Sequence, residues 1–169
     1  FDFSGCVKTP ASFDPVKLNW LQGEYYKELS TESKIQKLID YNPSYKDIPN
    51  LTKIVESIGD RVKTLADFDN FKFLWSDDLI YPQELLVSKI LPVKDHLLNI
   101  PFVNWDAKNL ELTVKEYCTT NNIKLGSIIH ALRVATTATT VGISLFDGLE
   151  ILGQDKVLTR IKNSLQHLT

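Results

Sequence analysis

Two arginines in this 169-residue chain stand in settings that suit recognition of a flat, polar ligand. Arg133 lies in an apolar helical pattern, next to Leu132 and Val134, and precedes a loop that ends with residues 142–145 (GISL). Arg61 lies in a short connection between two predicted helices. A guanidinium group presents N–H donors in a fixed planar fork and keeps its charge. Such groups favour binding over general acid–base catalysis, which needs side chains that titrate near neutrality.

Each arginine also has a purely structural interpretation. Arg61 could pair with Asp60 or Glu56 at the surface. Arg133 could instead satisfy carbonyl groups at the end of its own helix. The residues alone leave both interpretations open.

The motifs of several enzyme classes are missing from the sequence. It contains neither a Gly-x-Ser-x-Gly nucleophile elbow nor a glycine-rich phosphate-binding loop. Cys6 and Cys118 have the spacing of neither a zinc site nor a disulfide framework, and indicate a reducing, intracellular setting. The acidic pair Asp77-Asp78 falls in a predicted turn, where capping is the common role. We therefore predict no catalytic residue, no metal ligand and no cofactor within this chain.

Composition and charge exclude further classes of function. Apolar residues make up 43% and charged residues 24%, which is ordinary for a soluble globular protein, and no apolar run could span a bilayer. The net charge of −2 argues against indiscriminate nucleic-acid binding. Residues 1–123 carry 14 Lys/Arg against 18 Asp/Glu, whereas residues 124–169 carry 5 against 3. If RNA is bound, we expect directed contacts from the C-terminal quarter.

The start at Phe1, without Met or a signal peptide, predicts a piece of a longer protein.

Apolar residues recur at three- and four-residue spacing almost throughout the chain, so the predicted fold class is all-α. The predicted helical segments are residues 14–29, 30–42, 49–58, 64–75, 83–99 (broken or kinked at Pro92), 106–122, 123–137, 145–152 and 155–167. The residues predicted to be largely buried are Leu65, Phe68, Phe71, Leu132, Leu145, Phe146 and Leu152.

Four segments share their order and spacing with a known family. They are residues 10–20 (PASFDPVKLNW), 60–65 (DRVKTL), 124–137 (KLGSIIHALRVATT) and 145–153 (LFDGLEILG). Together they resemble the C-terminal half of a bacterial-type glutamyl-tRNA synthetase, a class I aminoacyl-tRNA synthetase. Each motif is weak alone, but the resemblance covers the whole chain.

The resemblance implies two helical subdomains that form an anticodon-binding helical cage. Residues 1–29 would be the tail of the stem-contacting region, and residues 30–81 and 82–169 the two halves of the cage. The catalytic domain would lie outside this chain. The parent ligase would attach glutamate to its tRNA with ATP and Mg²⁺ in protein biosynthesis, while this piece, without an active site, would recognise the anticodon.

The resemblance also assigns five tRNA-binding residues. Arg61 matches the arginine that faces the third anticodon base in glutamate-discriminating members, and Arg133 matches another anticodon-contacting arginine. Gly142, Ile143 and Leu145 match the loop that packs on the anticodon bases.

Two positions in this region depart from the family pattern. Ala138 replaces a common glycine, and Ile143 replaces a common proline. The backbone of the loop could therefore differ from that of the family. The implied partner is the anticodon of glutamate tRNA, tRNA(Glu), with neither DNA nor a membrane involved. A monomer in the cytoplasm, or in an organelle, is expected.

Two other functions remain open on the sequence. One is a freestanding helical RNA-binding module. The other is a helical protein-interaction scaffold without a role in RNA binding, which predicts an electrostatically featureless surface at Arg61 and Arg133.

Overall fold

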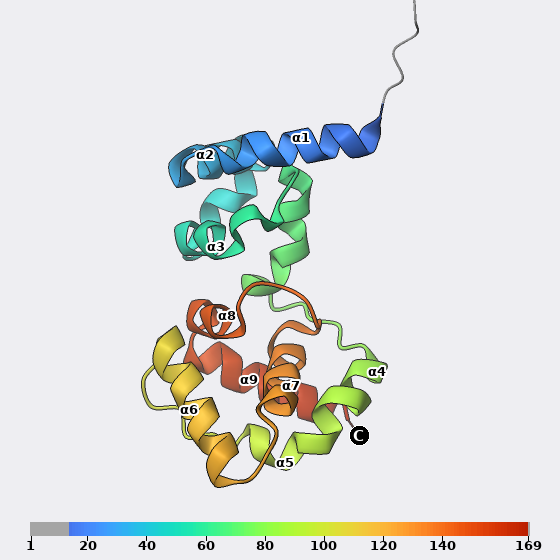
Figure 1. Cartoon of the computed structure of the whole chain (residues 1–169), viewed down its shortest axis with the longest axis vertical. Coiled ribbons are helices and arrows are strands. Elements are labelled where there is room, and N and C mark those ends of the chain that lie inside the picture. The colour runs from blue at the N-terminus through green and yellow to red at the C-terminus, as the bar shows by residue number, and fades with distance from the viewer. Residues whose placement is uncertain (1–13, 169) are drawn as a thin grey trace, which may run out of the picture.

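The computed structural model describes residues 14–168, and all of the regular secondary structure in that range is helical, which confirms the all-α prediction. The helices form two lobes stacked along the long axis of the molecule (Figure 1). The N-terminal lobe contains α1 (Pro15–Lys27), α2 (Thr31–Tyr41), η1 (Pro43–Asp47), α3 (Leu51–Ile58), η2 (Gly59–Arg61) and η3 (Leu65–Leu74). The C-terminal lobe contains α4 (Gln83–Leu85), η4 (Leu86–Ile90), η5 (Leu91–Val93), α5 (Lys94–Leu97), α6 (Ala107–Thr120), α7 (Leu125–Thr137), α8 (Leu145–Leu152) and α9 (Gln154–Gln166). Cys6 and residues 10–13 of the first family-like segment lie outside the described residues.

Short polar side chains begin several of these helices. The side chains of Asp14, Ser30 and Asp106 each accept a backbone N–H two or three residues further on, at 2.9, 3.2 and 3.0 Å. Each such cap satisfies a donor that the helix cannot pair itself and contributes about 1 kcal/mol. Gly153 ends α8 with a positive φ of 78°, and its N–H donates to Leu149 O at 3.0 Å. These boundaries follow the sequence prediction.

Two of the segments predicted as α-helix depart from regular α-helical geometry. Residues 65–74 form a 3₁₀-helix, which begins at a capping box between Thr64 and Asp67. The segment predicted over residues 83–99 is divided into α4, a π-helical turn (η4), a 3₁₀ turn (η5) and α5. Pro92 explains the break, because proline has no N–H to donate and its ring crowds the preceding turn.

The core of the N-terminal lobe is built around aromatic rings and buried aliphatic side chains. Phe68 stacks on Trp75 with ring centroids 4.9 Å apart and planes 18° from parallel. Two side chains of the C-terminal lobe, Ile143 and Ile151, belong to this same cluster. The two lobes therefore share apolar surface. Leu65, which we expected to be largely buried, is only half-buried because it borders an open groove.

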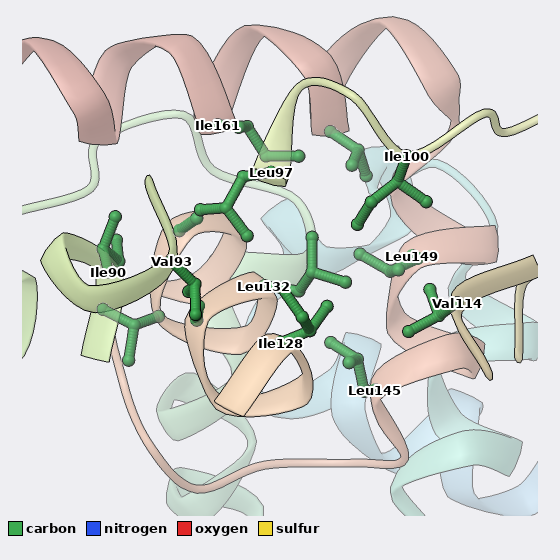
Figure 2. Packing of buried hydrophobic residues seen from close by; sticks show 14 of the residues in the cluster. Ile90, Val93, Leu97, Ile100, Val114, Ile128, Leu132, Leu145, Leu149 and Ile161 are labelled. Carbon is green, nitrogen blue, oxygen red and sulfur yellow. The ribbon is translucent and has the colours of Figure 1, made fainter. Parts of the chain in front are cut away.

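The core of the C-terminal lobe surrounds α7. Ile128 and Leu132 of α7 meet Leu149 of α8 and Ile161 of α9, and all four side chains are fully buried (Figure 2). Fully burying such a side chain stabilises the fold by about 1.5–3 kcal/mol. This packing holds α7, and therefore Arg133, in one orientation. The expected subdomain boundary between residues 81 and 82 stays a prediction.

Candidate nucleic-acid interface

Arg61 is the last residue of η2, the 3₁₀ turn that follows α3 in the N-terminal lobe. Gly59 turns the chain there with a positive φ of 56°, a conformation that glycine adopts without steric cost. The Nη1 atom of Arg61 donates to the carbonyl oxygen of Ile58 at 3.0 Å and, more weakly, to that of Ser57 at 3.4 Å. These carbonyls lie in the last turn of α3, where a cation is favoured. The rest of the side chain is exposed.

Arg133 stands on α7, in the C-terminal lobe. Its neighbours in sequence, Leu132 and Val134, are fully buried, whereas Arg133 itself is only half-buried. Its Nη1 atom donates to Ile143 O at 2.8 Å, so it pairs with the following loop rather than with the end of its own helix.

The two guanidinium groups are electrostatic neighbours. Burial lowers the pKa of Arg133, and the positive charge of Arg61 lowers it further. Within residues 14–168, the ion pairs include neither Arg61 nor Arg133. The pairing of Arg61 with Asp60 or Glu56 that the sequence left open is therefore not formed. Two close, unneutralised cations on adjacent lobes make a site suited to an anionic ligand.

The loop between α7 and α8 lies at the junction of the lobes, beneath η3 (Figure 1). The hydroxyl of Thr137 donates to Arg133 O at 2.7 Å, and Ala138 ends the helix in the left-handed region with φ 56°. This conformation suits glycine, which the resemblance led us to expect at position 138, and an alanine adopts it at a cost of about 1 kcal/mol or more.

The three loop residues predicted to pack on the anticodon differ in what they can offer. Ile143 and Leu145 are 3% and 6% exposed, with their side chains in the N-terminal and C-terminal clusters respectively. Gly142 is half-buried and packs closely: a Cβ atom added there would lie 3.1 Å from Cζ of Phe73 and 3.5 Å from Nη1 of Arg133. These residues can contribute backbone groups and shape. Their direct contact with anticodon bases stays a prediction.

Phe73 is a neighbour of this site that sequence reasoning did not single out. It lies two residues after the buried Phe71, and its ring packs partly on the core of the N-terminal lobe, 6.2 Å from the ring of Phe71. Its half-exposed ring borders Gly142 next to Arg133. Helical spacing alone marks Phe73 as one more aromatic residue at the edge of the core, so only the fold shows that it lies beside Gly142 and Arg133.

The described residues show no second site that fits nucleic acid, metal or membrane binding better than this one. A groove of about 760 Å³ lies between α1, α2 and the start of η3, but neither Arg61 nor Arg133 lines it. No group of three or more His, Cys, Asp or Glu side chains in the described part of the chain could hold a metal ion. No helix there is long and apolar enough to cross a membrane.

Comparison with known proteins is consistent with this geometry. Residues 31–165 match the family described as the anticodon binding domain. The chain belongs to this family. The resemblance read from the sequence is thereby confirmed at the level of the family, and the two arginines lie in adjacent lobes of an anticodon-binding fold.

The relatives of this domain include larger enzymes. The chain is 28% identical over 171 residues to glutamate–tRNA ligase 2 of Campylobacter curvus, and 30% identical over 173 residues to glutamate–tRNA ligase 1 of Campylobacter hominis. These alignments cover 98% and 99% of this chain but 37% of each relative. The chain thus spans little more than a third of the length of these ligases.

Solved structures share the fold at lower sequence identity. A glutamate tRNA ligase from Elizabethkingia meningosepticum, crystallised in complex with its amino acid, superposes with a TM-score of 0.82 at 17% identity over 100% of this chain and 36% of its own. The glutamate–tRNA synthetase of Elizabethkingia anophelis gives 0.79 at 17% identity over 98% of this chain and 34% of its own. At such identity the likeness establishes the helical fold.

Proposed function

We propose that this chain recognises the anticodon of glutamate tRNA as the anticodon-binding part of a glutamate–tRNA ligase. The complete ligase would attach glutamate to tRNA(Glu) with ATP and Mg²⁺. The catalytic chemistry belongs to the remainder of that enzyme, and the role of this chain is binding. The monomeric state and the cytoplasmic or organellar location are part of the same proposal.

The observation that carries the proposal is the pair of unneutralised arginines at the lobe junction. The charge of Arg61 lowers the pKa of Arg133, so holding both cations in the free protein costs electrostatic energy. A negatively charged RNA loop would offset that cost. Because the two arginines are electrostatic neighbours, a single extended trinucleotide could meet both at once.

The free donors of Arg61 suit one base edge better than another. Among the described residues only Nη1 of Arg61 has hydrogen-bond partners, which leaves Nη2 and Nε free to donate. The Watson–Crick edge of cytosine presents the acceptors O2 and N3, whereas guanine presents N1–H and N2–H donors. Facing donors in a partly desolvated site costs about 1–3 kcal/mol. Arg61 would therefore favour the C of glutamate anticodons over the G of glutamine anticodons at the third position.

Direct binding tests the proposal. The chain is titrated against a fluorescent RNA stem-loop that carries the glutamate anticodon, with anisotropy as the readout and salt varied from low to physiological concentration. We expect saturable binding that weakens with salt, as phosphate contacts require. The control RNA keeps the stem and loop length but carries an unrelated anticodon. Equal affinity for both RNAs would indicate a general RNA-binding module, and no binding to either would favour a protein-interaction scaffold.

A further inference from the structure

A third arginine, Arg160 of α9, is buried where the two lobes meet. Its Nη1 atom donates to the carbonyl oxygens of Phe73 and Thr136, both at 2.7 Å. Its Nη2 atom donates to the carbonyl oxygen of Ser76 at 2.7 Å and to Oδ1 of Asp77 at 3.3 Å. The residue is 4% exposed. One side chain thus connects three separate segments of the chain.

This arrangement is a costly way to bury a cation. Burial lowers the pKa of Arg160, against the opposing hydrogen bond and charge of Asp77, and that carboxylate is itself well exposed. The Nε atom of Arg160 is buried and has no hydrogen-bond partner among the described residues. Most of the compensation therefore comes from neutral carbonyl groups. An apolar side chain would avoid the desolvation cost, but it could not fix these carbonyls relative to one another.

The carbonyls that Arg160 joins belong to the two sides of the proposed RNA site. Phe73 lies in the last turn of η3 and borders the loop at Gly142, and Ser76 lies two residues after the end of η3. Thr136 lies in the last turn of α7, three residues after Arg133. The contacts of Arg160 therefore fix the N-terminal lobe, which carries Arg61, against the helix that carries Arg133.

We propose that Arg160 is a positioning residue that locks the end of η3 to the end of α7 and so sets the spacing of Arg61 and Arg133 for one anticodon. This inference rests on the proposed function. Arg160 itself is too deeply buried to touch RNA. Its effect would be exerted through the relative placement of the two lobes.

Three variants separate this role from the simple loss of a charge. Arg160→Met removes all of the hydrogen bonds, and Arg160→Lys keeps the charge but lacks the planar fork that reaches several carbonyls. The matched control is Lys156→Met. Lys156 lies on the same helix and its Nζ atom pairs with Oδ1 of the same Asp77 at 2.9 Å. This control removes one cation from Asp77 and leaves the carbonyl contacts in place.

The first measurement reports lobe placement without RNA. Spin labels are attached to cysteines introduced at the exposed positions Lys46 and Glu116, one in each lobe, in a background with Cys6→Ser and Cys118→Ala. Circular dichroism confirms that each variant is folded at the temperature used. We expect the distance distribution from pulsed electron paramagnetic resonance to broaden in Arg160→Met, to broaden less in Arg160→Lys, and to stay narrow in Lys156→Met. Equal distributions in all variants would overturn the inference; if Arg160→Met does not fold, Arg160→Lys decides.

The second measurement links placement to recognition. The affinity of each variant is measured for stem-loops with C or G at the third anticodon position. We expect Arg160→Met to weaken binding of the C-containing RNA by about 5–150-fold, the usual size of coupling between distant sites, and to reduce the preference for C over G. A residue that only stabilised the fold would lower the melting temperature and leave this preference unchanged in the folded protein. Failure of the wild-type chain to bind either RNA would overturn the proposed function, even where the spin-label distances still depended on Arg160.

Discussion

The Nη1 atom of Arg133 donates a 2.8 Å hydrogen bond to the carbonyl oxygen of Ile143. This bond closes the α7–α8 loop back onto the helix that precedes it. It uses only one of the five N–H donors of the guanidinium group, and the other donors have no partner among the described residues. Arg133 can therefore hold the loop and bind RNA at the same time, so its replacement should affect both.

Replacing Arg133 by Ala should weaken binding of both stem-loops to a similar extent. The residue is expected to meet a base or phosphate that glutamate and glutamine anticodon loops share. Loss of a charge-assisted hydrogen bond corresponds to about 1.5–3 kcal/mol, or roughly 10–100-fold in Kd. Anisotropy titrations at fixed salt measure this change. Lys162→Ala, which removes the same charge from an exposed position on α9, should change Kd much less. Equal losses in the two variants would mean that net charge alone matters.

Replacing Arg61 by Gln should change the preference between bases rather than affinity in general. Glutamine can present an acceptor as well as a donor, so an RNA with G at the third anticodon position loses little, whereas one with C loses a charge-assisted contact. We expect the ratio of the two affinities to shift by about 10–100-fold. Lys63→Gln removes a charge two residues further on and should leave the ratio unchanged. An unchanged ratio in Arg61→Gln would reduce Arg61 to a surface cation.

The sequence predicted helix boundaries correctly where neighbouring residues determine them. The caps at Asp14 and Ser30 and the helix end at Gly153 depend on residues within a few positions of each other. The 3₁₀ geometry of η3 and the π-turn of η4 were not predicted, because packing against distant elements selects among helix types of similar local pattern. The break near Pro92 was predictable, since proline removes a helical hydrogen bond whatever its surroundings.

The site was less predictable, because its parts are far apart in sequence. The residues indicated Arg61 and Arg133 one at a time, and the family resemblance assigned both to the anticodon, but only the fold shows that they are electrostatic neighbours. Arg160 carried a signal that was readable in principle: it lies three residues after Val157 and directly before Ile161, on the apolar face of α9. Its partners could not be inferred, because those carbonyls lie between 24 and 87 residues away in sequence.

Adding a methyl group at Gly142 should disturb the loop beside Arg133. A Cβ atom there would lie 3.1 Å from the ring of Phe73, and the φ of 154° is a backbone conformation that residues with side chains rarely adopt. We expect Gly142→Ala to lower the free energy of unfolding by about 1–3 kcal/mol and to weaken binding of the anticodon stem-loop. Denaturant titration and anisotropy measure the two effects.

Gly126→Ala is the matched control for this substitution. Gly126 lies in the first turn of α7, and nothing lies within 4 Å of an added Cβ atom. Alanine is a better helix former than glycine, so this change should be neutral or stabilise the protein by up to about 1 kcal/mol. Equal destabilisation by the two substitutions would show that the close packing at Gly142 has no special importance.

Glu150 joins the lobes by a second polar contact, and we expect the stability that this contact contributes to depend on pH. Its Oε1 atom accepts from Nζ of Lys53, on α3, at 2.6 Å, and its Oε2 atom accepts from the backbone N–H of Ala107, at the start of α6, at 3.0 Å. The hydrogen bond from Lys53 is the main reason that the pKa of Glu150 lies below its ordinary value of 4.5, while burial acts in the opposite direction. The charged form is therefore favoured in the folded protein.

Replacing Glu150 by Gln should destabilise the protein near neutral pH and much less in acid. A carboxyl group whose folded pKa is depressed stabilises the native state above its unfolded pKa, and this stability is lost as pH falls through the folded value. The side chains of Glu150 and Lys53 are 25% and 47% exposed, so solvent screening limits the contribution to about 0.5–1 kcal/mol. The free energies of unfolding of wild type and Glu150→Gln, measured by urea titration, should differ by this amount at pH 7, and the difference should shrink once pH falls below about 4.5.

Glu116→Gln, at an exposed carboxylate on α6, should show no comparable dependence. A difference that stayed constant down to pH 3 would mean that Glu150 stabilises the protein through packing or through hydrogen bonds that do not need its negative charge.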